Sequence, residues 1–258
     1  MNNKKEVRMF DNYTLKARFY PVIILFFPLI LLGVFYSFEF KTAIHLMSSL
    51  GLVGALIYLF SQLGRDSGKL KEPALWQSWG GSPSTQILRL KNTIIDQHTK
   101  KRYHQKLQSL CPISVPPDIN MESVEPERAD EIYRAWTKYL ISQTRDAQKF
   151  SLLLKDNISY GFRRNLWGLK RYAIISIISM ILINYLVWGI KNKTYNPLLF
   201  SESFIYSSCA LIMILLFWII AIKASWVKMP AFSYAERLCE ATESLIIPLG
   251  GEKKIITI

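Results

Sequence analysis

The chain is poor in the residues that build disulfide frameworks and metal centres. Its 258 residues include only three cysteines and three histidines. Cys111, Cys209 and Cys239 are far apart and share no motif, which argues against a disulfide framework and a cysteine-ligated metal. His98 and His104 are six residues apart, a spacing that does not place both on one helical face. We therefore expect no metal site and no cofactor.

Acidic residues are also scarce, with 19 Asp and Glu against 32 Lys and Arg, so the net charge is +13. In a soluble protein this excess would indicate nucleic-acid binding. Half of the residues are apolar, however, and the mean hydropathy is positive, which is typical of a membrane protein. Cytoplasmic segments of membrane proteins collect Lys and Arg. We therefore expect anionic phospholipid, rather than nucleic acid, to face these cations.

Charge is absent from four apolar segments, each close to the ~20 residues that a helix needs to cross a bilayer. The first follows a basic leader, but the run is too long for a cleaved signal peptide and no small-residue cleavage site follows it. The sequence therefore predicts four transmembrane helices. They cover about residues 19–36, 43–63, 172–190 and 204–222.

The distribution of Lys and Arg between these spans predicts the orientation. The counts are five in 1–18, one in 37–42, nineteen in 64–171, two in 191–203 and five in 223–258. The segments rich in cations are expected in the cytoplasm. Both termini and the middle segment are therefore predicted to be cytoplasmic.

The predicted fold is an all-α integral membrane protein. Two transmembrane hairpins, 19–63 and 172–222, flank a helical cytosolic domain at 64–171. A cytosolic leader at 1–18 precedes the hairpins. A cytosolic tail at 223–258 follows them and holds a short amphipathic helix, in which Ser233 and Glu236 have capping-box spacing.

Within the cytosolic domain, Gly64 and Gly68 fail the spacing of a phosphate-binding loop and are interpreted as a helix stop and turn. Asp96 is expected to cap a helix over 96–110, with Lys100 among the cations on its solvated side. In the next amphipathic helix, Asp130 and Arg134 are four residues apart and can pair on the wet face.

The segment WGGSPS, 79–84, has two readings. Its paired glycines permit positive φ, and Ser82 before Pro83 is typical of a helix start, whose amides can hold an anion. The alternative is a tight turn between two helices. Anion or lipid-headgroup contacts are predicted for Arg65, Lys69, Gly80, Gly81, Arg163, Arg164, Lys170 and Arg171, and interface or coupling roles for Trp76, Trp79 and Trp167.

Two features in the spans predict helix packing. Gly51 and Ala55 have the four-residue spacing of small side chains that lets helices approach closely. Asn184 can hydrogen-bond across helices inside the membrane. We expect these contacts in a homo-oligomer.

Two strings, GRDSGKLKEPALWQSWGGSPSTQILRL (64–90) and TRDAQKFSLLLKDNISYGFRRNLWGLKR (144–171), resemble a set of uncharacterised bacterial four-span inner-membrane proteins of similar length. The resemblance covers most of the cytosolic domain and the entry to the third span. It implies the same four-span plan and a place in the bacterial inner membrane. It implies no catalytic residue.

Three classes of function fit this pattern. The first is a non-enzymatic, oligomeric effector or sensor, for example in antiviral defence or stress, whose cytosolic domain receives a signal and couples it to the spans. The second is a scaffold that tethers a cytosolic protein partner to the membrane. The third, a transporter or membrane enzyme, is disfavoured because His45 is the one ionisable side chain in the spans, apart from tyrosine and cysteine, and no acid–base cluster is recognisable.

Overall fold

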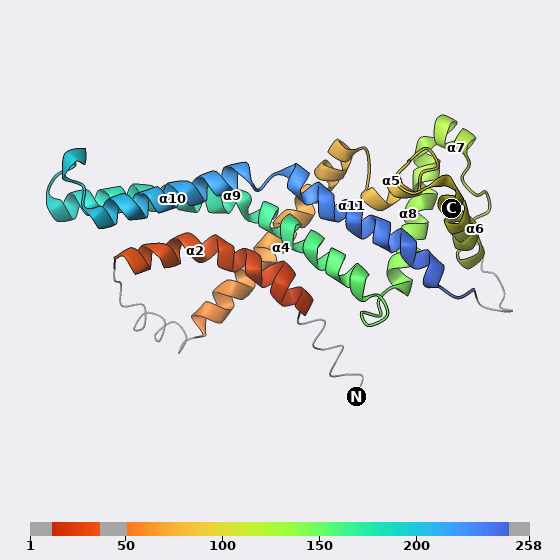
Figure 1. Cartoon of the computed structure of the whole chain (residues 1–258), viewed down its shortest axis with the longest axis horizontal. Helices are drawn as coiled ribbons and strands as arrows, with labels where there is room; N and C mark the ends of the chain where they lie inside the picture. Colours follow the sequence, from red (N-terminus) through yellow and green to blue (C-terminus); the bar gives the residue numbers. More distant parts are fainter. Residues whose placement is uncertain (1–11, 37–50, 248–258) are drawn as a thin grey trace. The chain divides into compact units, whose positions relative to one another are not determined.

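The computed structural model describes residues 12–36 and 51–247, and within these ranges every regular element is a helix (Figure 1). The described residues form two compact units. The apolar unit comprises residues up to 72 and 161–227. The polar unit comprises 73–160 and the described residues from 228 onwards. The boundary passes through three helices, α4 (Leu52–Trp79), α9 (Ser151–Asn192) and α11 (Ala224–Glu240).

The apolar unit contains the segments that the sequence assigns to the membrane. A π-helical turn, η1 (Thr14–Phe19), continues into α2 (Tyr20–Phe35), and the end of α9 is followed by η2 (Pro197–Leu199) and α10 (Glu202–Ile220). Three helices are long and apolar enough to cross a membrane: Thr14–Phe35, Ser151–Asn192 and Glu202–Ile220. The predicted span 43–63 begins outside the described residues, and α4 contains the rest of it.

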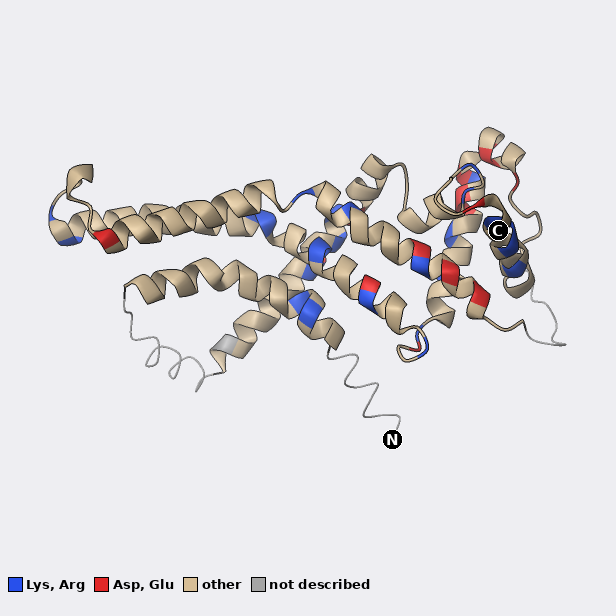
Figure 2. Cartoon of the chain, in the orientation of Figure 1, with Lys and Arg blue, Asp and Glu red and all other residues tan. Residues whose placement is uncertain are grey.

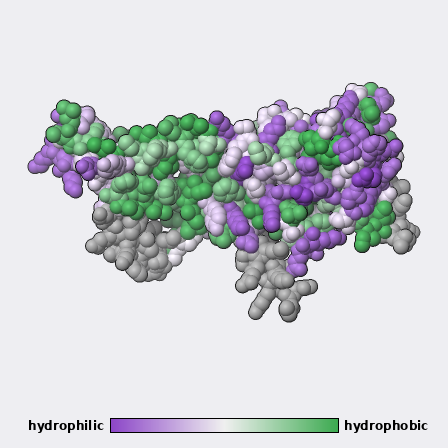
Figure 3. Space-filling view, viewed as in Figure 1, coloured by the Kyte–Doolittle hydropathy of each residue, from purple (hydrophilic) through white to green (hydrophobic). Residues whose placement is uncertain are grey.

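Helices α9 and α10 lie antiparallel, because their contacts pair late residues of one with early residues of the other (Figure 1). Trp188 donates a hydrogen bond to Ser201, and Asn184 donates one to Ser207. Charged side chains are nearly absent from both helices over this length, and their outer surface is apolar (Figures 2 and 3). Exposed apolar side chains of this kind are what a lipid environment requires. They include Ile175, Ile178, Leu182, Ile183, Val187, Met213, Leu216 and Phe217.

Helix α4 passes without a break through Gly64 and Gly68, so the predicted helix stop at these glycines is wrong. Both glycines instead face α9: a Cβ on Gly64 would lie 3.1 Å from the Leu169 side chain, and a Cβ on Gly68 would lie 2.9 Å from the Arg164 oxygen. A Cβ on Gly168 would lie 2.6 Å from the Gly68 nitrogen and 2.8 Å from the Gly64 oxygen. Two glycines four residues apart therefore bring the two backbones together, the packing that the sequence analysis assigned to the spacing of Gly51 and Ala55.

The polar unit contains α5 (Pro83–Leu88), α6 (Gln97–Leu110), α7 (Ile119–Val124), α8 (Pro126–Gln143) and η3 (Ala241–Ser244), besides the parts of α4, α9 and α11. Its core forms around α8, whose buried side chains recur at three- and four-residue intervals as an amphipathic helix requires. They are Ala129, Ile132, Tyr133, Trp136 and Leu140.

Among the local predictions in the polar unit, the cap at Asp96 is confirmed, whereas those for Lys100 and Ser233 are wrong. Asp96 caps α6, as expected, by accepting from the Thr99 amide at 2.9 Å. Lys100 is not solvated but buried, with 1% of its surface exposed. Ser233 is not a cap, because α11 begins at Ala224 and the Ser233 hydroxyl donates back to the Met229 carbonyl.

Candidate functional site

The loop after α4 gives the polar unit its most specific backbone geometry. Gly80 and Gly81 have φ of +92° and +127°, which side chains other than glycine rarely adopt. Their amides donate to the carbonyls of Gln77 and Trp76 and so close the end of α4. The amides that the sequence offered to an anion at these two glycines are thus used by the helix itself.

The carbonyls of the two glycines are also engaged. Arg89 donates to the Gly80 oxygen at 3.0 Å, and Gln86 donates to the Gly81 oxygen at 2.6 Å. Ser82 has an extended backbone and precedes Pro83 at the first position of α5, as predicted. This loop is therefore fixed by side chains from the helix that follows it.

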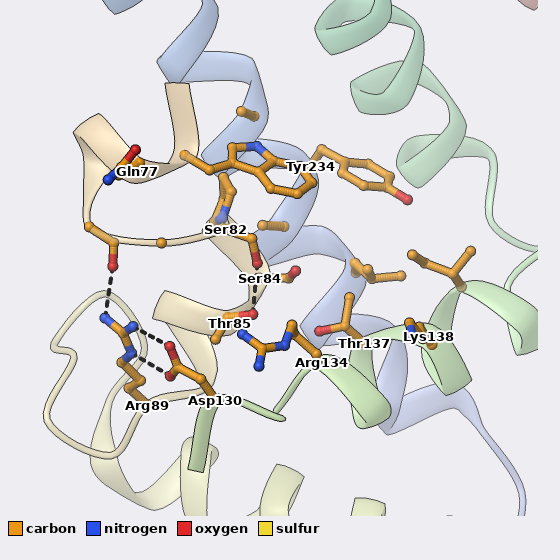
Figure 4. Close-up of a pocket in the computed structure, with 18 of the residues that line it drawn as sticks. Gln77, Ser82, Ser84, Thr85, Arg89, Asp130, Arg134, Thr137, Lys138 and Tyr234 are labelled. Atoms are coloured by element: carbon orange, nitrogen blue, oxygen red, sulfur yellow. Dashed lines mark hydrogen bonds and ion pairs between the residues drawn. The ribbon is translucent and has the colours of Figure 1, made fainter. Parts of the chain in front are cut away.

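Beside this loop lies a cavity of about 580 Å³, within the usual range of ligand pockets (Figure 4). All of its walls belong to the polar unit: the end of α4, the loop, the start of α5, one face of α8, Tyr160 of α9 and one face of α11. Apolar atoms make up most of the exposed lining, although half of the lining residues have polar or charged side chains. The cavity is the candidate functional site.

One wall of the cavity is fixed by an ion pair between Arg89 and Asp130. The guanidinium donates to both carboxylate oxygens, at 2.9 and 2.6 Å, and Asp130 is buried (Figure 4). The bond to Asp130 raises the pKa of Arg89. Asp130 therefore does not form the predicted pair with Arg134, because Arg89, 41 residues earlier, occupies it.

The segment that carries Arg89 is held by two buried side chains. Glu122 accepts from the amide of Leu90 at 2.5 Å and from the hydroxyl of Tyr133 at 2.7 Å. Lys100 donates to the carbonyls of Arg89 and Asn92. Buried ionised groups need such complete satisfaction, so both residues fix the backbone behind the cavity wall.

Two residues that line the cavity each carry a buried polar atom without a partner within the described ranges. These atoms are the indole nitrogen of Trp76 and the hydroxyl of Thr137. Two cations of α8, Arg134 and Lys138, also line the cavity. Trp76 was predicted from the sequence, and Arg134 was predicted only as a partner of Asp130, whereas Thr137 and Lys138 were missed. The available signal was the spacing of Arg134 and Lys138 on the side opposite the apolar stripe, with Thr137 next to the stripe.

The predicted cations near the third span lie in the apolar unit and are mostly engaged with protein. Arg163 donates to the Trp226 carbonyl at 3.0 Å and stacks over the Trp226 ring. Pro230, four residues further on, has no amide for that carbonyl, so Arg163 supplies the missing donor. Arg164 is buried and pairs with Glu72 at 3.0 Å.

Lys170 donates to the carbonyls of Ile219 and Ile222 at the end of α10 and so caps that helix. Arg65 bonds to its neighbour Asp66, whereas Lys69 and Arg171 are exposed. Direct contact of these cations with headgroups stays a prediction.

The remaining predicted residues are dispersed. Trp79 packs against Phe232, and Trp167 lies under the Lys71 ammonium at 5.0 Å from the ring centre. A Cβ on Gly51 would meet no described atom within 4 Å, and Ala55 is exposed. Of the three packing residues, Asn184 has bonds across helices in the described part of the chain: it donates to Ser207 and Ser208 and accepts from Tyr36.

Within residues 12–36 and 51–247, no group of three or more His, Cys, Asp or Glu side chains is placed to hold a metal ion. No protein-family model, curated protein or solved structure matches the chain.

Proposed function

We propose that this chain is a non-enzymatic membrane effector or sensor, in which the polar unit receives a signal and the apolar unit responds to it in the bilayer. In this proposal the protein is a homo-oligomer of the bacterial inner membrane. It has four spans, and both termini and the polar unit face the cytoplasm. The asymmetric distribution of Lys and Arg supports this orientation.

The observation that carries the proposal is the continuity of α9. Its 42 residues begin in the polar unit, where Tyr160 lines the cavity, and end in a segment apolar enough to span a membrane. Helix α4 also contributes to both units, and its residue Trp76 lines the same cavity. A ligand that moved either helix in the polar unit would act on a segment of the apolar unit through an unbroken backbone.

The contact between α4 and α9 inside the apolar unit offers a route for this response. The Lys71 ammonium donates to the Gly168 carbonyl at 3.2 Å and lies over the Trp167 ring. Ser67 donates to the same carbonyl at 3.0 Å. In the proposed mechanism, α4 and α9 shift against each other at this contact when the signal arrives.

Two measurements test the proposal. A reporter fused near residue 120 should be active only in the cytoplasm, and an exported reporter would contradict the orientation. In bacteria that produce the full chain, a voltage-sensitive dye should report depolarisation, and an unchanged potential would contradict the effector function.

Matched variants test the α4–α9 contact. Lys71→Met removes the donor to Gly168, and we expect it to reduce the depolarisation severalfold. Lys155→Met removes the same charge from α9, at an exposed side chain with no hydrogen bond in the described structure, and should leave the response unchanged. Equal responses of the two variants would contradict a role for this contact.

A further inference from the structure

The unused hydrogen-bonding groups of the cavity indicate part of what it binds. The indole N–H of Trp76 can only donate, so it needs an acceptor atom. The hydroxyl of Thr137 can donate or accept. A buried polar atom without a partner costs roughly 1–3 kcal/mol. Rotation of these two side chains would turn the buried atoms into the cavity, where ligand acceptor atoms would remove this cost. The cavity therefore favours an occupant with oxygen or nitrogen acceptors.

The charges around the cavity favour an anion. Arg89 and Asp130 neutralise each other through two short bonds. Arg134 is held only loosely, with Glu127 and Glu131 at 3.8 and 4.0 Å, beyond hydrogen-bond distance. Lys138 has no acid within 4.0 Å in the described part of the chain.

Glu127 is the other acidic residue of the lining and is almost fully exposed. Of the charged side chains on α8, this leaves the ammonium of Lys138 and the guanidinium of Arg134 as groups that an incoming anion can contact. Both stand on the same helix as Thr137, one turn or less away from it (Figure 4).

The rest of the lining favours a flat ring. The rings of Tyr160 and Tyr234 stack with 13° between their planes and centroids 6.5 Å apart, and both residues line the cavity with Trp76. On α11, Ala231 and Ala235 are one turn apart and leave space next to these rings. Aromatic walls with small residues between them accept a planar apolar group better than a flexible chain.

We propose that this cavity binds a small organic anion that carries a flat ring and is about the size of a nucleoside monophosphate. The ring packs among Trp76, Tyr160 and Tyr234. The anionic group contacts Arg134 and Lys138, and an acceptor atom meets the Trp76 N–H. This inference deepens the proposed function because it names the chemistry of the signal. It rests on that function in one respect, that the polar unit receives the signal.

The test is calorimetric titration of the purified full chain in detergent, with AMP as the probe. Adenosine tests the ring without the anion, and glycerol 3-phosphate tests the anion of a lipid headgroup without the ring. We expect AMP to bind, and each partial probe to bind at least tenfold more weakly. Absence of AMP binding at millimolar concentration would overturn the proposal. Binding of glycerol 3-phosphate as tight as that of AMP would identify a headgroup site instead.

Variants of α8 locate the site. Lys138→Gln should weaken AMP binding about tenfold, since a charge-assisted hydrogen bond is lost. Arg128→Gln removes an exposed cation of the same helix that lies outside the cavity, and should change the affinity less than twofold. Equal weakening by both variants would show a general charge effect and overturn the site.

Thr137→Val separates binding from folding. The hydroxyl has no partner among the residues that the structure describes, so the variant should melt at or above the wild-type temperature, yet bind AMP severalfold more weakly. Unchanged AMP affinity would contradict the role of Thr137. Because none of these titrations uses membrane potential, binding without depolarisation would refute the effector function alone, and depolarisation without binding would refute the ligand alone.

Discussion

The crossing of α4 and α9 makes the sharpest stability prediction. At Gly168 an added Cβ would lie 2.6 Å from the Gly68 nitrogen, which is 0.8 Å inside the 3.4 Å where ordinary contact begins. The opposing atoms are backbone atoms, so no side chain can rotate away. Gly168→Ala therefore requires the two helices to move apart.

The magnitude follows from two opposing contributions. Overpacking of a close contact costs typically about 1–3 kcal/mol, and more where backbone must move. Replacing glycine with alanine inside a helix stabilises the helix by up to about 1 kcal/mol. We therefore expect Gly168→Ala to lower the free energy of unfolding by about 1–2 kcal/mol.

A matched control exists on α4 itself. A Cβ on Gly54 would meet no described atom within 4 Å, so Gly54→Ala should have only the favourable effect on helix propensity. The two variants should then differ by about 2 kcal/mol, or about 4–8 °C in melting temperature for a chain of this size. Thermal unfolding of the detergent-solubilised chain, followed by circular dichroism, measures this difference. Equal melting temperatures would refute the close approach of α4 and α9.

Three further predictions concern single side chains. Lys100→Met should lower stability by about 2–3 kcal/mol in denaturant titrations, because the carbonyls of Arg89 and Asn92 lose their buried donor, and an unaffected midpoint would contradict this. Burial lowers the pKa of His104 from 6.5, so below pH 6.5 the unfolded state takes up a proton that the folded state resists, and stability falls. His104→Gln should flatten the decline of melting temperature between pH 7 and 5, and a decline as steep as in the wild type would exclude His104 as its source. Asn184→Leu should lower stability by about 1 kcal/mol through loss of its bonds to Ser207 and Ser208, and chemical unfolding in detergent that shows no change would mean that these bonds contribute nothing.

Much of the architecture could be predicted from local composition. Apolar runs of membrane-spanning length correctly predicted the three long apolar helices, because insertion depends on the summed hydropathy of one continuous segment. The helical character of 64–171 and the cap at Asp96 also follow from near neighbours in the sequence. The number of spans, the orientation and the oligomer remain predictions.

The wrong predictions for Lys100 and Asp130 have the same physical cause. In each case the side chain is bound by a partner that lies outside its own helix. Lys100 carries a charge in a cation-rich helix, and only the carbonyls of Arg89 and Asn92, supplied by the fold, make its burial tolerable. Asp130 had a partner at helical spacing, yet the bidentate geometry of Arg89 competes better than a loose pair with Arg134.

The sequence by itself determined where the chain is apolar, where it is basic and which segments are helical, since these properties depend on each residue and its neighbours within a few turns. Tertiary structure alone decided that Gly64 and Gly68 form a packing surface and not a turn, because Gly168 lies a hundred residues further along the chain. The tertiary structure also forms the cavity, whose walls come from five helices and one loop. A site of this kind exists only as a relation between distant segments, and no local pattern records it.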